Sequence, residues 1–183
     1  MRVKYSLVLI CIMLAFAATA SAQAVQSVYT ELSGKGCKTI EEDADSAGYM
    51  LQQCRGVAGY NLQVVSQDDR QTVVVVKPDG SKHELDLGVI GGGGFSSLRG
   101  KAEWRVKRER GKIIPIALII RLDVSTDSSN SEKITSYLSV SKITPQSICY
   151  IEAIDPSPNA NVAARRMADS SANKPCYKLT SPD

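Results

Sequence analysis

The chain has 183 residues, of which 43% are hydrophobic, 22% are charged and 5% are aromatic. This length fits one ordinary domain, and the charged fraction excludes a wholly disordered chain. The formal net charge is only +3, and the single histidine excludes any metal site or proton relay that needs two histidines. These counts by themselves indicate no particular activity.

Residues 1–22 have the pattern of a secretory signal peptide. Arg2 and Lys4 give a basic start, an apolar stretch follows, and residues 20–22 form an A-x-A cleavage signature. A retained membrane anchor is the alternative, but the apolar stretch is too short to span a bilayer. The longest later apolar run, residues 113–120, is also too short to do so. We therefore expect export and no membrane span in the mature chain.

Removal of the signal peptide changes the charge balance. It takes away two basic residues, which leaves 20 basic against 19 acidic side chains and a net charge of +1 over 161 residues. A nearly neutral chain does not call for nucleic acid as a partner. We expect one disulfide-braced globular domain over residues 23–176 and a flexible tail over residues 177–183.

Four cysteines remain after the signal peptide, namely Cys37, Cys54, Cys149 and Cys176. An even number in an exported protein favours disulfides, and three pairings are possible. Pairing of sequence neighbours, Cys37 with Cys54 and Cys149 with Cys176, closes two local loops, each worth about 3 kcal/mol. A zinc site is the alternative, but the chain has no CxxC pair and His83 is far from all four cysteines in sequence.

Short segments with alternating or β-branched residues predict a mainly β (α+β) fold, an antiparallel sheet or sandwich of about eight short strands. These segments are residues 27–32, 60–66, 71–77, 82–87, 101–107, 113–124, 134–140 and 148–154. Small residues recur with helical spacing from Asn159 to Ser171, which predicts one C-terminal helix packed on the sheet. We also expect a short helical turn between Cys37 and Cys54.

Three local features add detail to the predicted strands and their connections. Ala102, Trp104 and Val106 alternate with charged residues, which predicts one buried and one solvated face. Pro115 conflicts with a central strand and predicts a bulge or a strand end. The glycine-rich residues 88–94 indicate either a mobile connection or a place where the backbone passes close to another segment.

The first cysteine loop contains a cluster of carboxylates. Glu41, Glu42, Asp43 and Asp45 lie within five residues of one another. Carboxylates on a constrained loop can bind Ca²⁺ or a basic surface, but their spacing does not match a calcium-binding loop. A solvated acidic loop is the ordinary interpretation. The cluster is our candidate for a partner-binding loop.

A basic stretch follows over residues 99–112. Glu103 and Glu109 interrupt it, and Trp104 faces the other side of the strand, so that no aromatic stacking platform accompanies the cations. We interpret the stretch as a solvated strand face that charges protect from edge pairing. It could also contact an anionic envelope polymer.

No complete catalytic set is present in the sequence. His83 has carboxylates nearby at Glu84 and Asp86, but no nucleophile elbow accompanies it. The glycine-rich loop lacks the spacing of a phosphate loop, and the S-x-x-K match at residues 139–142 lies in a predicted strand. We therefore predict no catalytic residue, cofactor or metal.

Four segments carry a resemblance, together with the four cysteines. They are residues 95–105, 115–121, 135–142 and 158–161. They resemble a group of small exported bacterial proteins to which no activity is assigned, which implies a bacterial envelope and brings no ligand or catalytic residue.

Two functions remain open. The first is a non-enzymatic binding or envelope accessory module, whose partner is another envelope protein or a cell-wall polymer. The alternative is a small carboxylate-dependent envelope hydrolase that uses Glu84 and Asp86, which requires both carboxylates in one pocket at catalytic separation.

Overall fold

The computed structural model of the chain describes residues 24–127 and 129–178. The predicted signal peptide and all but two residues of the predicted C-terminal tail lie outside the described residues. Two antiparallel sheets of five strands each and one α-helix make up the described part, which confirms the predicted fold class with ten strands in place of about eight.

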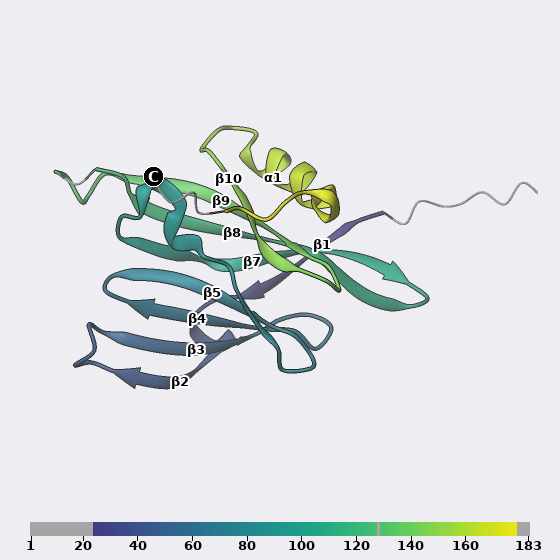
Figure 1. The fold of residues 1–183 in the computed structure, drawn as a ribbon, viewed down its shortest axis with the longest axis horizontal. Helices are drawn as coiled ribbons and strands as arrows, with labels where there is room; N and C mark the ends of the chain where they lie inside the picture. The colour runs from purple at the N-terminus through teal and green to yellow at the C-terminus, as the bar shows by residue number, and fades with distance from the viewer. Residues whose placement is uncertain (1–23, 128, 179–183) are drawn as a thin grey trace, which may run out of the picture.

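The first sheet, here called sheet A, has the order β1-β7-β8-β9-β10 and forms the upper half of Figure 1. Its strands are β1 (Gln26–Glu31), β7 (Ser96–Glu109), β8 (Lys112–Ser125), β9 (Ile134–Ile143) and β10 (Ile148–Ile154). The central strand β8 is buried on both faces over most of its length, as its continuous apolar run predicts.

The second sheet, sheet B, is a meander with the order β2-β3-β4-β5-β6. Its strands are β2 (Cys37–Asp43), β3 (Tyr49–Arg55), β4 (Asn61–Gln67), β5 (Arg70–Val76) and β6 (Lys82–Glu84). The expected helical turn between Cys37 and Cys54 is wrong, since β2 and β3 form a hairpin there. After its first residue β2 is exposed throughout, and an edge strand that is solvated on both faces carries no alternating apolar pattern.

The core lies between the two sheets. Large apolar side chains from both sheets are almost fully buried there, among them Leu62, Val64, Val73, Val75, Trp104, Leu118, Ile120 and Leu122. The Trp104 indole N–H donates to Thr30 Oγ1 at 2.8 Å, and its ring meets Tyr60 edge to face. Gly56 lies against this pair, and a Cβ there would come within 2.6 Å of the Tyr60 carbonyl oxygen.

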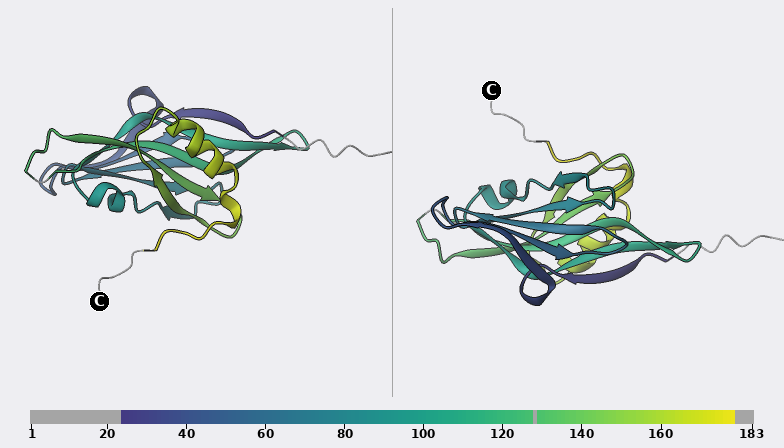
Figure 2. Two further views of the ribbon diagram at one scale, coloured as in Figure 1. Left: turned by 90° about the horizontal axis from the view of Figure 1, so that it is seen from above. Right: turned by 90° about the horizontal axis from the view of Figure 1, so that it is seen from below.

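Helix α1 (Ala160–Asp169) covers the outer face of sheet A. Ala160, Ala164 and Ala168 are buried against Ile119 and Val140, because small side chains let the helix approach the sheet closely. The predicted helix and its small-residue face are confirmed. Figure 2 shows α1 in front of sheet A from above and sheet B from below.

The charged face of β7 departs from the expectation of a solvated surface. Glu103 and Arg105 are buried beneath α1. Glu103 accepts hydrogen bonds from Arg165 Nε at 2.6 Å and from Ser27 Oγ at 2.5 Å, while Arg105 Nε donates to Asp169 at 2.7 Å. Alternation along β7 shows which face is polar, but it does not reveal that a helix from the far end of the chain covers that face.

Two disulfides brace the sandwich with the predicted pairing. Cys37 and Cys54 face each other across β2 and β3, and Cys149 on β10 is joined to Cys176 after α1. Disulfides are typical of oxidising, extracellular environments. In the part of the chain that the structure describes, no helix combines the length and apolarity needed to cross a membrane.

The proline and glycine predictions are also confirmed. Arg105 pairs with Ala117 whereas Val106 pairs with Pro115, so β8 has one extra residue and bulges at this point. In the glycine-rich loop, a Cβ on Gly94 would overlap the Ser125 carbonyl oxygen. This loop is therefore a place where two backbone segments pass close together.

Candidate functional site

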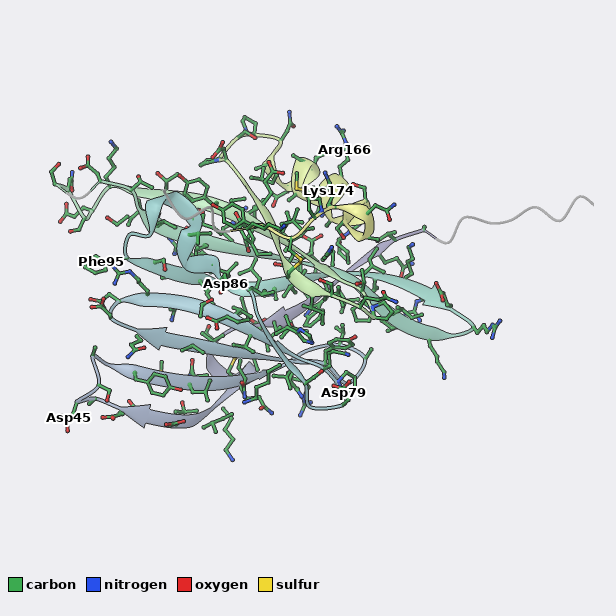
Figure 3. The ribbon with its side chains drawn as sticks, in the orientation of Figure 1. Asp45, Asp79, Asp86, Phe95, Arg166 and Lys174 are labelled. Carbon is green, nitrogen blue, oxygen red and sulfur yellow. A yellow bond between two sulfur atoms is a disulfide. The ribbon has the colours of Figure 1, made fainter. Side chains whose placement is uncertain are left out.

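The antiparallel topology places one group of turns at each end of the long axis. The β2–β3 and β4–β5 turns lie together, since the Asp68 N–H donates to the Ala47 carbonyl at 2.9 Å. The start of β7 joins them, where the Ser96 N–H donates to the Asp69 carbonyl at 2.9 Å. The β3–β4, β5–β6 and β7–β8 turns lie at the opposite end, and Figure 3 shows Asp45 and Asp79 far apart.

The end that holds the β2–β3 and β4–β5 turns is here called the acidic end. Its carboxylates are Glu41, Glu42, Asp43, Asp45, Asp68 and Asp69. Four of them are the predicted partner-binding loop, and all four are exposed on β2 and the turn after it. Asp68 and Asp69 come from the next hairpin and were missed, although their place between the predicted strands 60–66 and 71–77 indicated a turn.

Asp43 organises the turn after β2. Its carboxylate accepts hydrogen bonds from Ser46 Oγ at 2.6 Å and from the Asp45 N–H at 3.0 Å. The Ser46 hydroxyl contributes most, and these bonds hold the pKa of Asp43 below its ordinary value. Within residues 24–127 and 129–178, no group of three or more His, Cys, Asp or Glu side chains is arranged to hold a metal ion.

A cavity of about 720 Å³ lies on the outer face of sheet B and is here called the outer groove. Val65 pairs with Thr72 across β4 and β5, and both point away from the core because their neighbours Val64 and Val73 point into it. Val89 of the 3-10 helix η2 (Leu87–Gly92) also lines the groove. Apolar side chains therefore form much of its lining.

Carboxylates also line the groove. Glu84 points outward because the next residue, Leu85, is fully buried in the core. Asp86 follows in a left-handed conformation, with φ of 50°, which turns the chain from β6 into η2. Asp68 completes the set from the β4–β5 turn. Thr72 Oγ1 is buried in the groove lining and has no hydrogen-bond partner among the described residues.

The groove's cation is already engaged. Arg70 forms an ion pair with Asp68, donates from Nε to the Gly93 carbonyl at 3.2 Å, and lies over the Phe95 ring at 5.2 Å. Glu84 and Asp86, in contrast, have no ion pair with any residue that the structure describes. The groove therefore combines apolar lining with two uncompensated negative charges.

The catalytic candidates divide between two faces. His83 and Glu84 are successive residues of β6 and point to opposite sides of sheet B, so they do not converge. Glu84 and Asp86 do share the outer groove. In the S-x-x-K match, Ser139 donates to the Ile120 carbonyl inside sheet A, and no acylation site forms there.

The fold and the groove define a disulfide-braced β-sandwich with an acidic groove on the outer face of sheet B. Comparisons of the chain with models of protein families, with characterised proteins and with solved structures give no match. The geometry and charge of the groove are therefore the features of this protein that bear on its function.

Proposed function

We propose that the protein is an exported binding module whose outer groove takes a cationic, extended segment of a partner. The observation that carries this proposal is the pair Glu84 and Asp86, two carboxylates without ion pairs, beside the apolar side chains of Val65 and Val89. Helix α1 lies on sheet A, and on this side of sheet B the 3-10 helix η2 contacts β5 and contributes Val89 to the groove lining.

The chemistry of the groove favours lysine or arginine side chains. Their aliphatic stems can lie along Val65 and Val89 while the charged groups reach the carboxylates. The acidic end next to the groove extends the negative potential, which speeds the approach of a cationic partner. Of the two partners expected from the sequence, a basic segment of an envelope protein fits this site better than an anionic cell-wall polymer.

Export is part of the proposal and has three supports. Residues 1–22 have the pattern of a signal peptide, two disulfides brace the domain, and the sequence resembles small exported bacterial proteins. We infer a periplasmic or secreted location.

A peptide titration tests the groove. The probe is a labelled decapeptide that alternates lysine with valine and threonine, and its counterpart has glutamate in place of lysine. We expect the lysine peptide alone to bind, and Glu84→Gln with Asp86→Asn to weaken binding by about five-fold to ten-fold. The matched control, Glu152→Gln with Asp155→Asn on sheet A and the loop after it, keeps wild-type affinity. If the groove variant and the control variant bind the lysine peptide with equal affinity, the proposal is contradicted.

The carboxylate-dependent hydrolase is the second candidate, because Glu84 and Asp86 share one groove. Its test is release of reducing ends from purified peptidoglycan, with Glu84→Gln and Asp86→Asn made separately. Hydrolysis predicts that each single variant abolishes release. We favour binding because no aromatic side chain that could support a sugar ring lines the groove among its described residues.

A further inference from the structure

The end opposite the acidic end carries a second concentration of charge, here called the basic end. Its cations are Arg55, Lys82, Lys107, Arg108, Arg110 and Lys112. They come from three separate turns, and none forms an ion pair within the described ranges. Four of the six lie in the basic stretch of residues 99–112, and the fold brings Arg55 and Lys82 to the same end. The exposed carboxylates of Asp79 and Glu109 also lie at this end, where the cations outnumber them.

The β7–β8 hairpin presents most of this charge. Arg110 and Gly111 form its tight turn, with φ values of 50° and 78°. Figure 1 shows the hairpin extending beyond the neighbouring β3–β4 and β5–β6 turns. Its cations are therefore the first part of the basic end to meet a flat charged surface.

A cavity with a mixed apolar and polar lining opens beside the same hairpin. Its volume is about 440 Å³, and its lining includes Ile114, Ile143, Pro145, Lys77 and Lys107. Asp169 also lines it, and its carboxylate is paired with Arg105. Lys107 and Ile114 are direct cross-strand partners, and Ile114 is 37% exposed. Cationic and apolar groups thus alternate over a short distance at this end.

We propose that the basic end docks on a bilayer surface rich in anionic lipid headgroups. The hairpin cations contact the phosphates, while Ile114 and the neighbouring cavity accept apolar parts of the lipid. An anionic polysaccharide would need the cations alone, so the apolar side chains among them, such as the exposed Ile114, favour lipid. This inference is independent of the outer groove.

The charge separation also sets the orientation of the bound protein. An anionic surface attracts the basic end and repels the carboxylates of the acidic end. The protein would therefore stand with its hairpin on the bilayer and its acidic end away from it. That orientation leaves the β2–β3 and β4–β5 turns open to a partner in solution.

Vesicle cosedimentation tests the proposal. We expect binding to phosphatidylcholine vesicles that contain phosphatidylglycerol, no binding to phosphatidylcholine alone, and loss of binding at about 1 M salt. Arg108→Glu with Arg110→Glu should weaken binding by about 25-fold or more, since each neutralised cation is worth about five-fold. The control, Lys133→Glu with Arg166→Glu, makes the same charge change away from the basic end and keeps most of the binding.

Two further measurements separate lipid from a soluble polyanion. Ile114→Ser should weaken vesicle binding by about five-fold and leave binding to soluble polyphosphate unchanged. If polyphosphate binds as tightly as vesicles and Ile114→Ser changes neither, the partner is a polyanion and the proposal is overturned. Equal effects of the basic-end and control variants would overturn it as well. Glu84→Gln with Asp86→Asn should keep vesicle binding. A failure of the groove proposal can therefore be distinguished from a failure of the lipid proposal.

Discussion

Glu103 is the residue on which we expect the largest electrostatic effect on stability. Its side chain is 10% exposed, and that of Arg105 is 9% exposed. Replacement by glutamine keeps the shape but removes the charge that Arg165 and Arg105 face. Breaking a buried ion pair costs about 3–5 kcal/mol. Because Arg165 is partly exposed and can be hydrated, we expect Glu103→Gln to lower the free energy of unfolding by about 2–3 kcal/mol.

The effect should depend on pH with a defined sign. Burial, the largest single influence, raises the pKa of Glu103, but the hydrogen bonds and charge of Arg165 and the bonds from Ser27 and Tyr29 together lower it below 4.5. A lowered pKa means that the ionised carboxylate stabilises the fold, and this contribution is complete when the pH lies above the ordinary pKa of a glutamate. That contribution is lost as the pH falls through the lowered pKa of the folded protein. The difference in the free energy of unfolding between wild type and Glu103→Gln should therefore be largest at neutral pH and vanish in strong acid.

Urea unfolding of both proteins over a series of pH values measures this difference. The control is Glu109→Gln, an exposed carboxylate on the same strand, which should change stability by less than about 0.5 kcal/mol. Amide exchange in α1 should also rise in Glu103→Gln, because Arg165 lies on that helix. A difference that stays constant with pH, or a control as destabilised as Glu103→Gln, would refute the reasoning.

Two other changes test the backbone constraints. Replacing Cys149 and Cys176 with serine should lower the free energy of unfolding by about 3.5 kcal/mol by loop entropy, as chemical denaturation would show, and an unchanged midpoint would contradict this. Gly94→Ala should cost about 2–3 kcal/mol because its Cβ would overlap the Ser125 carbonyl oxygen. Its control is Gly100→Ala, where a Cβ meets open space, and similar thermal unfolding of both variants would count against the close approach.

Much of the architecture could be predicted from local patterns. Alternation in residues 101–107 identified the core face of β7, and the small residues after Asn159 identified the buried face of α1. The two cysteine pairs followed from proximity in sequence. Each of these signals lies within one element or one local loop, where periodicity and spacing have direct geometric meaning.

Two features of the fold could not be predicted this way. Strand β2 is solvated on both faces after Cys37, so its residues show no alternation that would distinguish it from a loop. The burial of Glu103 depends on Arg165, which lies 62 residues further along the chain. A strand's own pattern contains no information about a helix that packs on its polar face.

The sequence by itself determined most of the strands, the C-terminal helix and the acidic cluster at residues 41–45, and it favoured the observed disulfide pairing among three possible ones. Only the tertiary structure decided where charges meet. Antiparallel pairing returns the chain to the same end at every second turn, so Asp43 and Asp68 gather at one end and Arg55 and Arg110 at the other. Net charge sums over the whole chain, whereas a partner senses local potential. A chain of net charge near zero can therefore present both an acidic groove and a basic hairpin.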